Sequence, residues 1–163
     1  MSLRERSGPY EVVPMQASHV DEMVEIEHMS HPNPWSLDSF RHELRANPFS
    51  RPRVALTLED APSVAGYCVL WVVFEHAFIQ NVAVHPRHRR CGLATLLVER
   101  AIAEARDGGA ESVALDARRS NVAAHRLYQS LGFRVAGARK DYYTHPREDA
   151  LSFERTVTRE AEA

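Results

Sequence analysis

The segment that most constrains the fold is 79–94, which reads IQNVAVHPRHRRCGLA. It starts as a strand-like run that stops at His85-Pro86, continues through the basic residues 87–90, and passes from Gly92 into the helical sequence LATLLVERAIAEA. Backbone N–H groups at a helix start have no internal partners, and the helix dipole favours negative charge there. We therefore expect an anion site at this turn, and a ligand that carries a phosphate or pyrophosphate.

The composition is that of a single soluble globular domain. The chain has 163 residues, of which 44% are hydrophobic and 26% charged, and a net charge of −2, so its overall charge does not indicate nucleic acid binding. Its two cysteines, Cys68 and Cys91, favour neither a disulfide framework nor a zinc site. There is no secretory signal and no apolar run that could span a bilayer. These features predict a cytoplasmic protein without metal, membrane or direct nucleic-acid contacts.

Hydrophobic periodicity and breaker residues set the expected order of elements. Strands are expected over 10–15, 53–58, 65–74, 77–84, 112–117, 133–138 and 150–156, and helices after the N-caps Ser18 and Ser36 and over 92–106 and 121–131. This order predicts an α/β (α+β) fold, a single domain over 9–157 with a mixed, mostly antiparallel central sheet and helices on both faces. Residues 1–8 and 158–163 are expected to be flexible tails.

Two motifs resemble those of the GNAT N-acetyltransferases. The run Arg89-x-x-Gly92-x-Ala94 after NVAV is similar to the family's coenzyme A pyrophosphate loop, and 116–133, DARRSNVAAHRLYQSLGF, resembles the family's S/A-N-x-x-A-x-x-L-Y-x-x-x-G-F helix in full. The resemblance extends from the first strand to Thr156. It implies a GNAT-like domain and acetyl-CoA as cosubstrate.

Three further segments resemble the RimI-type subgroup, which acetylates the N-terminal alanine of ribosomal protein S18. They are PWS at 34–36 with Phe40, the run NVAVHP, and KDYY at 140–143 before EDA at 148–150. The resemblance implies acetyl transfer to the N-terminal α-amine of a protein, with S18 as a partner. Acetylation of a small-molecule amine and an acetyl-CoA-binding module without turnover stay open as alternatives.

The resemblance also implies the cofactor contacts. The strand would offer backbone groups to the pantetheine arm, the turn would cradle the pyrophosphate through backbone N–H groups, and Arg89 and Arg90 would add positive charge. Asn121 would bond the pantetheine region, although an N-cap requires the same residue type. The residues concerned are Val82, Ala83, Val84, Arg89, Arg90, Cys91, Gly92, Leu93, Ala94, Thr95 and Asn121.

By the same resemblance, Tyr128 is the expected partner of the departing thiolate. With reference pKa values of about 10 for a phenol and 8.5 for a thiol, complete proton transfer is uphill by about 2 kcal/mol. A hydrogen bond that tightens in the transition state is therefore an alternative to proton transfer. A tyrosine packed in the core would give the same sequence pattern.

Asp116 falls where the RimI pattern has a glutamate acting as general base. Its side chain is one methylene shorter, so a bridging water is expected. Glu75 and His76, which precede the cofactor strand, are rival bases. At pH 7 the deprotonation of an α-amine costs only about 1.4 kcal/mol, and that of a lysine amine about 4.6 kcal/mol. A weak base therefore suits an N-terminal α-amine better than a lysine as the acceptor.

Aromatic and acidic side chains are candidates for the acceptor groove. Trp35, Tyr142 and Tyr143 would line it, with Glu75 and His76 nearby, because aromatic rings suit contact with a peptide backbone. Six acidic residues could attract a basic peptide tail or could form a solvated face. They are Glu22, Glu25, Glu27, Asp38, Glu43 and Asp141.

Overall fold

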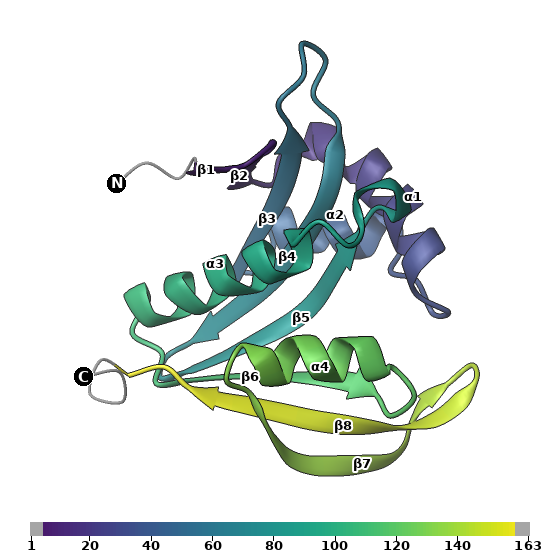
Figure 1. Cartoon of the computed structure of the whole chain (residues 1–163), viewed down its shortest axis with the longest axis vertical. Helices are drawn as coiled ribbons and strands as arrows, with labels where there is room; N and C mark the ends of the chain where they lie inside the picture. The colour runs from purple at the N-terminus through teal and green to yellow at the C-terminus, as the bar shows by residue number, and fades with distance from the viewer. Residues whose placement is uncertain (1–4, 159–163) are drawn as a thin grey trace.

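The computed structural model describes residues 5–158 and contains one eight-stranded sheet in the order β1-β2-β3-β4-β5-β6-β8-β7 (Figure 1). Every neighbouring pair is antiparallel except β5 and β6, which are parallel, so the expected mixed, mostly antiparallel sheet is confirmed. The strands are β1 Glu5–Ser7, β2 Tyr10–Pro14, β3 Ser50–Thr57, β4 Val64–Val73, β5 His76–Val84, β6 Ser112–Arg118, β7 Arg134–Thr144 and β8 Arg147–Thr156.

Helices cover both faces of the sheet, as expected. They are α1 Val20–Ser30, α2 Leu37–Arg45, α3 Leu93–Asp107 and α4 Val122–Ser130. Helices α1 and α2 pack on one face and α3 and α4 on the other. Successive side chains of a strand point to opposite faces, so one strand can contribute to both clusters. Tyr67 of β4 thus lies in the cluster with α1 and α2, and Cys68 in the cluster with α3. No helix among residues 5–158 is both long and apolar enough to cross a membrane.

The helix caps agree with the sequence at α2 but not at α1. Ser36 is the N-cap of α2, and its hydroxyl accepts the Ser39 N–H at 3.1 Å. Ser18 is not a cap, because a short 3₁₀ turn over Ala17–His19 precedes α1. There the N–H of Gln16 donates to His19 Nδ1 at 2.9 Å, so the cap forms two residues earlier than expected.

The ends of several elements also differ from expectation. Strand β3 begins at Ser50 and β7 extends to Thr144, because pairing with β4 and β8 recruits residues whose own pattern is weak. Residues Glu5–Ser7, which belong to the expected tail over 1–8, pair with the edge of β2 through a turn at Gly8, φ +59°. The remaining tail residues, 1–4 and 159–163, lie outside the described part of the chain.

Strands β5 and β6 pair over three residues only and then diverge. The pairs run from His76 with Ser112 to Phe78 with Ala114, and beyond them the two strands form the arms of a V (Figure 1). A β-bulge leaves Gln80 without a partner on β4. In a regular strand Ile79 and Asn81, two residues apart, would point to the same face. The extra residue instead puts Ile79 on the α3 face and turns Asn81 toward α1.

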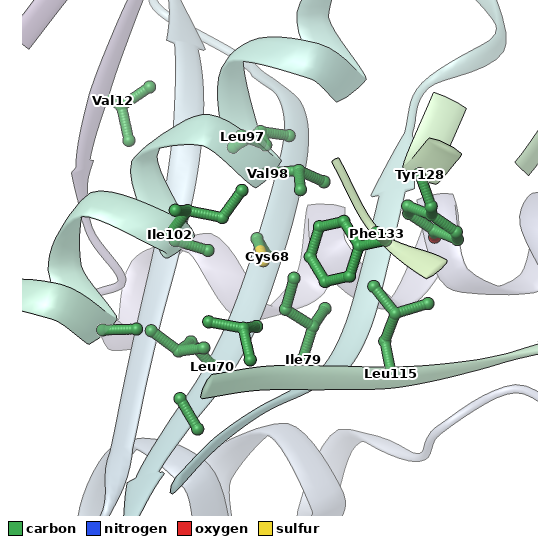
Figure 2. Packing of buried hydrophobic residues seen from close by; sticks show 14 of the residues in the cluster. Val12, Cys68, Leu70, Ile79, Leu97, Val98, Ile102, Leu115, Tyr128 and Phe133 are labelled. Atoms are coloured by element: carbon green, nitrogen blue, oxygen red, sulfur yellow. The ribbon is translucent and has the colours of Figure 1, made fainter. Parts of the chain in front are cut away.

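The α4 side of the V is closed by apolar packing. Figure 2 shows Ile79 of β5 and Leu115 of β6 near Tyr128 and Phe133, with Leu97 and Val98 of α3 beside them. The Tyr128 ring centroid lies 6.0 Å from that of Phe133 and 5.7 Å from that of Phe153. These contacts hold α4 against β6 and β8, and so they determine where Tyr128 lies.

The close approach of β4 to β5 gives a stability prediction. A Cβ added at Gly66 would lie 2.8 Å from the Ala83 carbonyl oxygen and 3.2 Å from Leu97 Cδ1. We expect Gly66→Ala to lower the free energy of unfolding by about 1–3 kcal/mol in chemical denaturation, because a backbone atom must move. Gly137→Ala is the control, since nothing lies within 4 Å of its added Cβ. Equal stability of the two variants would contradict the described packing of these strands.

Candidate functional site

The open end of the V contains a cavity of about 260 Å³. Its walls come from β5, β6, α1, the segment after α1, α4 and β7. The cavity brings together seven residues that the sequence singled out, although they are far apart in the chain: Glu27, Trp35, Val82, Asp116, Asn121, Tyr128 and Tyr143.

Asp116 lies on the β6 wall, held by its neighbours in the sheet. Ser152, its register partner on β8, donates its hydroxyl to Asp116 Oδ1 at 2.6 Å, and Arg139 Nε of β7 lies 3.7 Å from Oδ2. A quarter of the side chain, 25%, is exposed. The carboxylate therefore has a defined orientation, and its short arm keeps it close to the strand.

Tyr128 is a buried tyrosine that also lines the cavity. Its ring packs in the core, as the core interpretation predicts, and the residue also forms part of the cavity wall; its role toward the thiolate stays a prediction. Burial raises the pKa of Tyr128. The phenol therefore stays protonated at neutral pH and can act as a hydrogen-bond donor.

Glu27 is the site residue whose place the sequence interpretation missed. It is 1% exposed, so a solvated or peptide-attracting surface role is wrong for this residue. Its Oε1 accepts the Trp35 N–H at 3.1 Å, and its Oε2 accepts Asn81 Nδ2 at 2.8 Å and the Tyr67 hydroxyl. Burial, and then the charge of Glu27, raise the pKa of Tyr67, which keeps that phenol a donor.

A sequence signal for this burial did exist. Glu27 lies four residues after Met23 and seven after Val20, which is the spacing of the buried stripe of α1. A carboxylate on the apolar stripe of a helix is unusual and is rarely buried without partners. Its partners come from β4, β5 and the segment after α1, and the chain order did not show that these would meet.

The aromatic wall includes two of the three expected rings. Trp35 and Tyr143 line the cavity, whereas Tyr142 lies outside it, half exposed, with its ring centroid 5.1 Å from that of Tyr143. The Arg118 guanidinium lies over the Tyr143 ring, 4.2 Å from its centroid, and donates to the Pro146 carbonyl at 3.0 Å. Burial and then the charge of Asp116 raise the pKa of Tyr143 to about 12.

Glu75 and His76 are not brought to this cavity. They lie at the turn from β4 to β5, where β5 still pairs with β6, and His76 Nδ1 is 3.2 Å from Ser112 Oγ. Glu75 and His76 therefore lie at the closed end of the V, while the cavity occupies the open end. Neither residue lines the cavity, and this position favours Asp116 over both as the base.

The other expected acidic residues do not form a surface around the cavity either. Glu43 is buried and accepts Trp71 Nε1 at 2.8 Å, and Glu22 and Glu25 line a separate cavity of about 230 Å³. Asp38 and Asp141 each lie 3.9 Å from an arginine nitrogen. Among residues 5–158, no cluster of three or more His, Cys, Asp or Glu residues could hold a metal ion.

A second cavity, of about 320 Å³, lies at the start of α3. Gly92 is the N-cap at φ +79°, and the first residues of α3, whose N–H groups have no partner within the helix, line the cavity. Seven of the expected cofactor residues line this cavity, together with His88. They are Val84, Arg89, Arg90, Gly92, Leu93, Ala94 and Thr95. This geometry fits a pyrophosphate.

Two residues of the turn behave differently from expectation. Cys91 does not line this cavity, and its Sγ lies 2.6 Å from the His88 carbonyl oxygen and 3.2 Å from the Tyr10 hydroxyl. Arg89 donates Nε to the Val84 carbonyl at 3.1 Å, so it fixes the turn to the end of β5 as well as adding charge.

The backbone of β5 offers groups to the open side of the V. His85 donates its N–H to Ala65 of β4 at 2.8 Å. Because alternate residues of a strand direct their backbone groups to opposite sides, those of Val82 and Val84 face the gap and those of Ala83 face β4. Asn121 is the N-cap of α4 and accepts the Ala124 N–H at 3.2 Å, so its capping role is observed.

Comparison with known proteins agrees with this geometry. Residues 20–133 match the Acetyltransferase (GNAT) family. A relative from Bacillus subtilis (strain 168) is 38% identical over 137 residues, 84% of this chain and 89% of that protein. The ribosomal protein bS18-alanine N-acetyltransferase of Escherichia coli (strain K12) is 36% identical over 128 residues, 77% of this chain and 83% of that protein. The crystal structure of the ribosomal-protein-S18-alanine N-acetyltransferase from Escherichia coli superposes with a TM-score of 0.81, covering 91% of this chain and 94% of that chain at 29% identity.

Proposed function

The chain belongs to the GNAT family of acetyltransferases, and from this premise we propose that it transfers the acetyl group of acetyl-CoA to the N-terminal α-amine of a protein. The proposed acceptor begins with alanine, as in ribosomal protein S18, because relatives with 36% identity carry that activity in their names. We propose a cytoplasmic location as well, which an acceptor of this kind requires.

One observation carries the proposal: the two cavities adjoin at the open end of the V. Neighbouring residues line them, Val82 and Val84 on β5 and Ala123 and Ala124 on α4. The cavity at α3 fits a pyrophosphate, and the cavity with Asp116 and Tyr128 has the aromatic wall that suits a peptide end. A cofactor that extends along β5 would thus reach the acceptor.

The residues present fit acetyl-CoA. First-turn N–H groups of α3 would hold the pyrophosphate, with positive charge from Arg90. Backbone groups of Val82 and Val84 would pair with the amides of the pantetheine arm in the manner of an added strand. When bound there, acetyl-CoA supplies a thioester as the acetyl donor.

In the proposed reaction, the acceptor nitrogen attacks the thioester carbonyl directly. A C–N bond forms and the C–S bond breaks, while Asp116 takes a proton from the nitrogen through a bridging water. Tyr128 stabilises the departing thiolate. Because its pKa is raised, a hydrogen bond from Tyr128 is favoured over complete proton transfer.

The test of this function is acceptor selection. The purified protein is incubated with acetyl-CoA and either peptides that begin with Ala, Ser or Met or small amines, and thiol release and product mass are measured. We expect the highest kcat/KM for the alanine peptide. Turnover of small amines alone would support the small-molecule alternative, and tight CoA binding without any release would support a non-catalytic module.

Tyr128→Phe tests the role of the phenol. We expect kcat to fall by about 100-fold, the cost of removing one transition-state hydrogen bond, with little change in the KM for acetyl-CoA. The phenylalanine ring keeps the packing on Phe133 and Phe153, so thermal denaturation checks the fold. Equal losses in kcat and in cofactor affinity would contradict the assigned role.

Asp116→Asn tests the base. We expect kcat to fall by about 100-fold or more and the acidic limb of the pH–rate profile that belongs to this carboxylate to disappear. Glu75→Gln and His76→Ala are controls, because both residues lie at the closed end of the V. If either control removes the acidic limb instead, Asp116 is not the base.

A further inference from the structure

His31 has a ring nitrogen without a partner at the wall of the acceptor cavity. The residue follows α1 directly, where its N–H bonds to the Glu27 carbonyl at 3.0 Å, and it lines the cavity beside Glu27 and Trp35. Its Nε2 is buried and makes no hydrogen bond with residues 5–158. A buried polar atom without a partner costs free energy unless a ligand or a neighbouring group uses it.

The group nearest to this nitrogen is the buried carboxylate of Glu27. Nε2 of His31 lies 3.9 Å from Glu27 Oε2, and the two side chains differ sharply in exposure, 37% against 1%. Glu27 is thus the inner and His31 the outer member of a pair that leads from the cavity to solvent. The distance exceeds a hydrogen bond, but catalytic contacts often tighten when substrate binds, and no hydrogen bond holds Nε2 in its present position.

Glu27 also keeps capacity for a ligand. A carboxylate has about four acceptor positions. Three donors use three of them: Trp35 at Oε1, and Tyr67 and Asn81 at Oε2. One position on Oε1 is left for an acceptor ammonium at the cavity. The other ionisable groups that line this cavity, Asp116, Arg118, Tyr128 and Tyr143, come from β6, α4 and β7.

The reaction requires an exit for a proton. Under the proposed function, an acceptor ammonium with three N–H bonds becomes an amide with one, and acetyl-CoA becomes a free thiol. Two protons leave the nitrogen for each C–N bond formed and C–S bond broken. One of these protons ends on the sulfur of the thiol, and the other must reach solvent.

We propose that Glu27 and His31 form the exit path for the proton that must reach solvent. The ammonium gives a proton to Glu27 and becomes the neutral amine that attacks. Nε2 of His31, which no hydrogen bond holds in place, moves to Oε1 and takes the proton there, and the imidazole loses a proton from Nδ1 to water. Asp116, on the opposite wall, takes the proton that leaves nitrogen as the amide forms and returns it through water to the thiolate, so the products are the amide, the free thiol and one proton in solvent. His31 thus acts through Glu27, as a positioning and relay residue.

The test is chemical rescue of His31→Ala. With the alanine peptide, we expect kcat to fall by about 10-fold or more with unchanged KM for acetyl-CoA, and added imidazole to restore part of the loss. His31→Phe fills the space and is not rescued. His28→Ala, at an exposed position of α1, keeps wild-type kcat. Asp116→Asn shows no response to imidazole, because its defect lies elsewhere.

The outcomes separate this inference from the proposed function on which it rests. Lack of peptide acetylation by the wild-type protein would overturn the function. If the wild type is active, a folded His31→Ala variant with full kcat, or with a loss that imidazole does not restore, overturns the relay. Should the alanine variant fail to fold, His31→Gln is measured instead: reduced kcat at normal KM supports the relay and wild-type kcat overturns it.

Discussion

The arrangement of the site depends on the short pairing between β5 and β6. After three residue pairs the strands separate, and the aromatic packing of Tyr128 against Phe133 and Phe153 holds α4 beside the gap. Were the sheet continuous, the outer backbone groups of β5 would be used in the ladder and no cavity would form. The same divergence therefore creates the unpaired edge of β5 and the space between Asp116 and Glu27.

The bulge at Gln80 also shapes the cavity. It lets one strand supply Ile79 to the core under α4 and Asn81 to the carboxylate of Glu27 on the opposite face. Three hydrogen bonds to Glu27 then join α1, β4, β5 and the segment that carries Trp35. A buried charge that costs free energy to desolvate is stabilised in this way at the place where an ammonium is expected to bind.

The two walls of the cavity differ in their electrostatics. On β6, Asp116 is partly exposed and contacts Ser152 and Arg139, whereas on α1 Glu27 is enclosed, with the more exposed His31 beside it. The phenols nearby, Tyr67, Tyr128 and Tyr143, all have raised pKa values and remain donors. The proposed chemistry thus uses carboxylates to accept protons and phenols to donate hydrogen bonds.

Local patterns in the sequence were enough to predict the helices, most strands, the helix start at Gly92 and the family, because periodicity, glycine and backbone N–H groups act over short distances. Only the tertiary structure decided which side chains meet. It separated Glu75 and His76 from the cavity, placed Glu27 and His31 in it, and added β1 to the sheet. The reason is physical: burial, strand divergence and a one-residue bulge depend on contacts between segments that are distant in the chain, and local propensity does not encode those contacts.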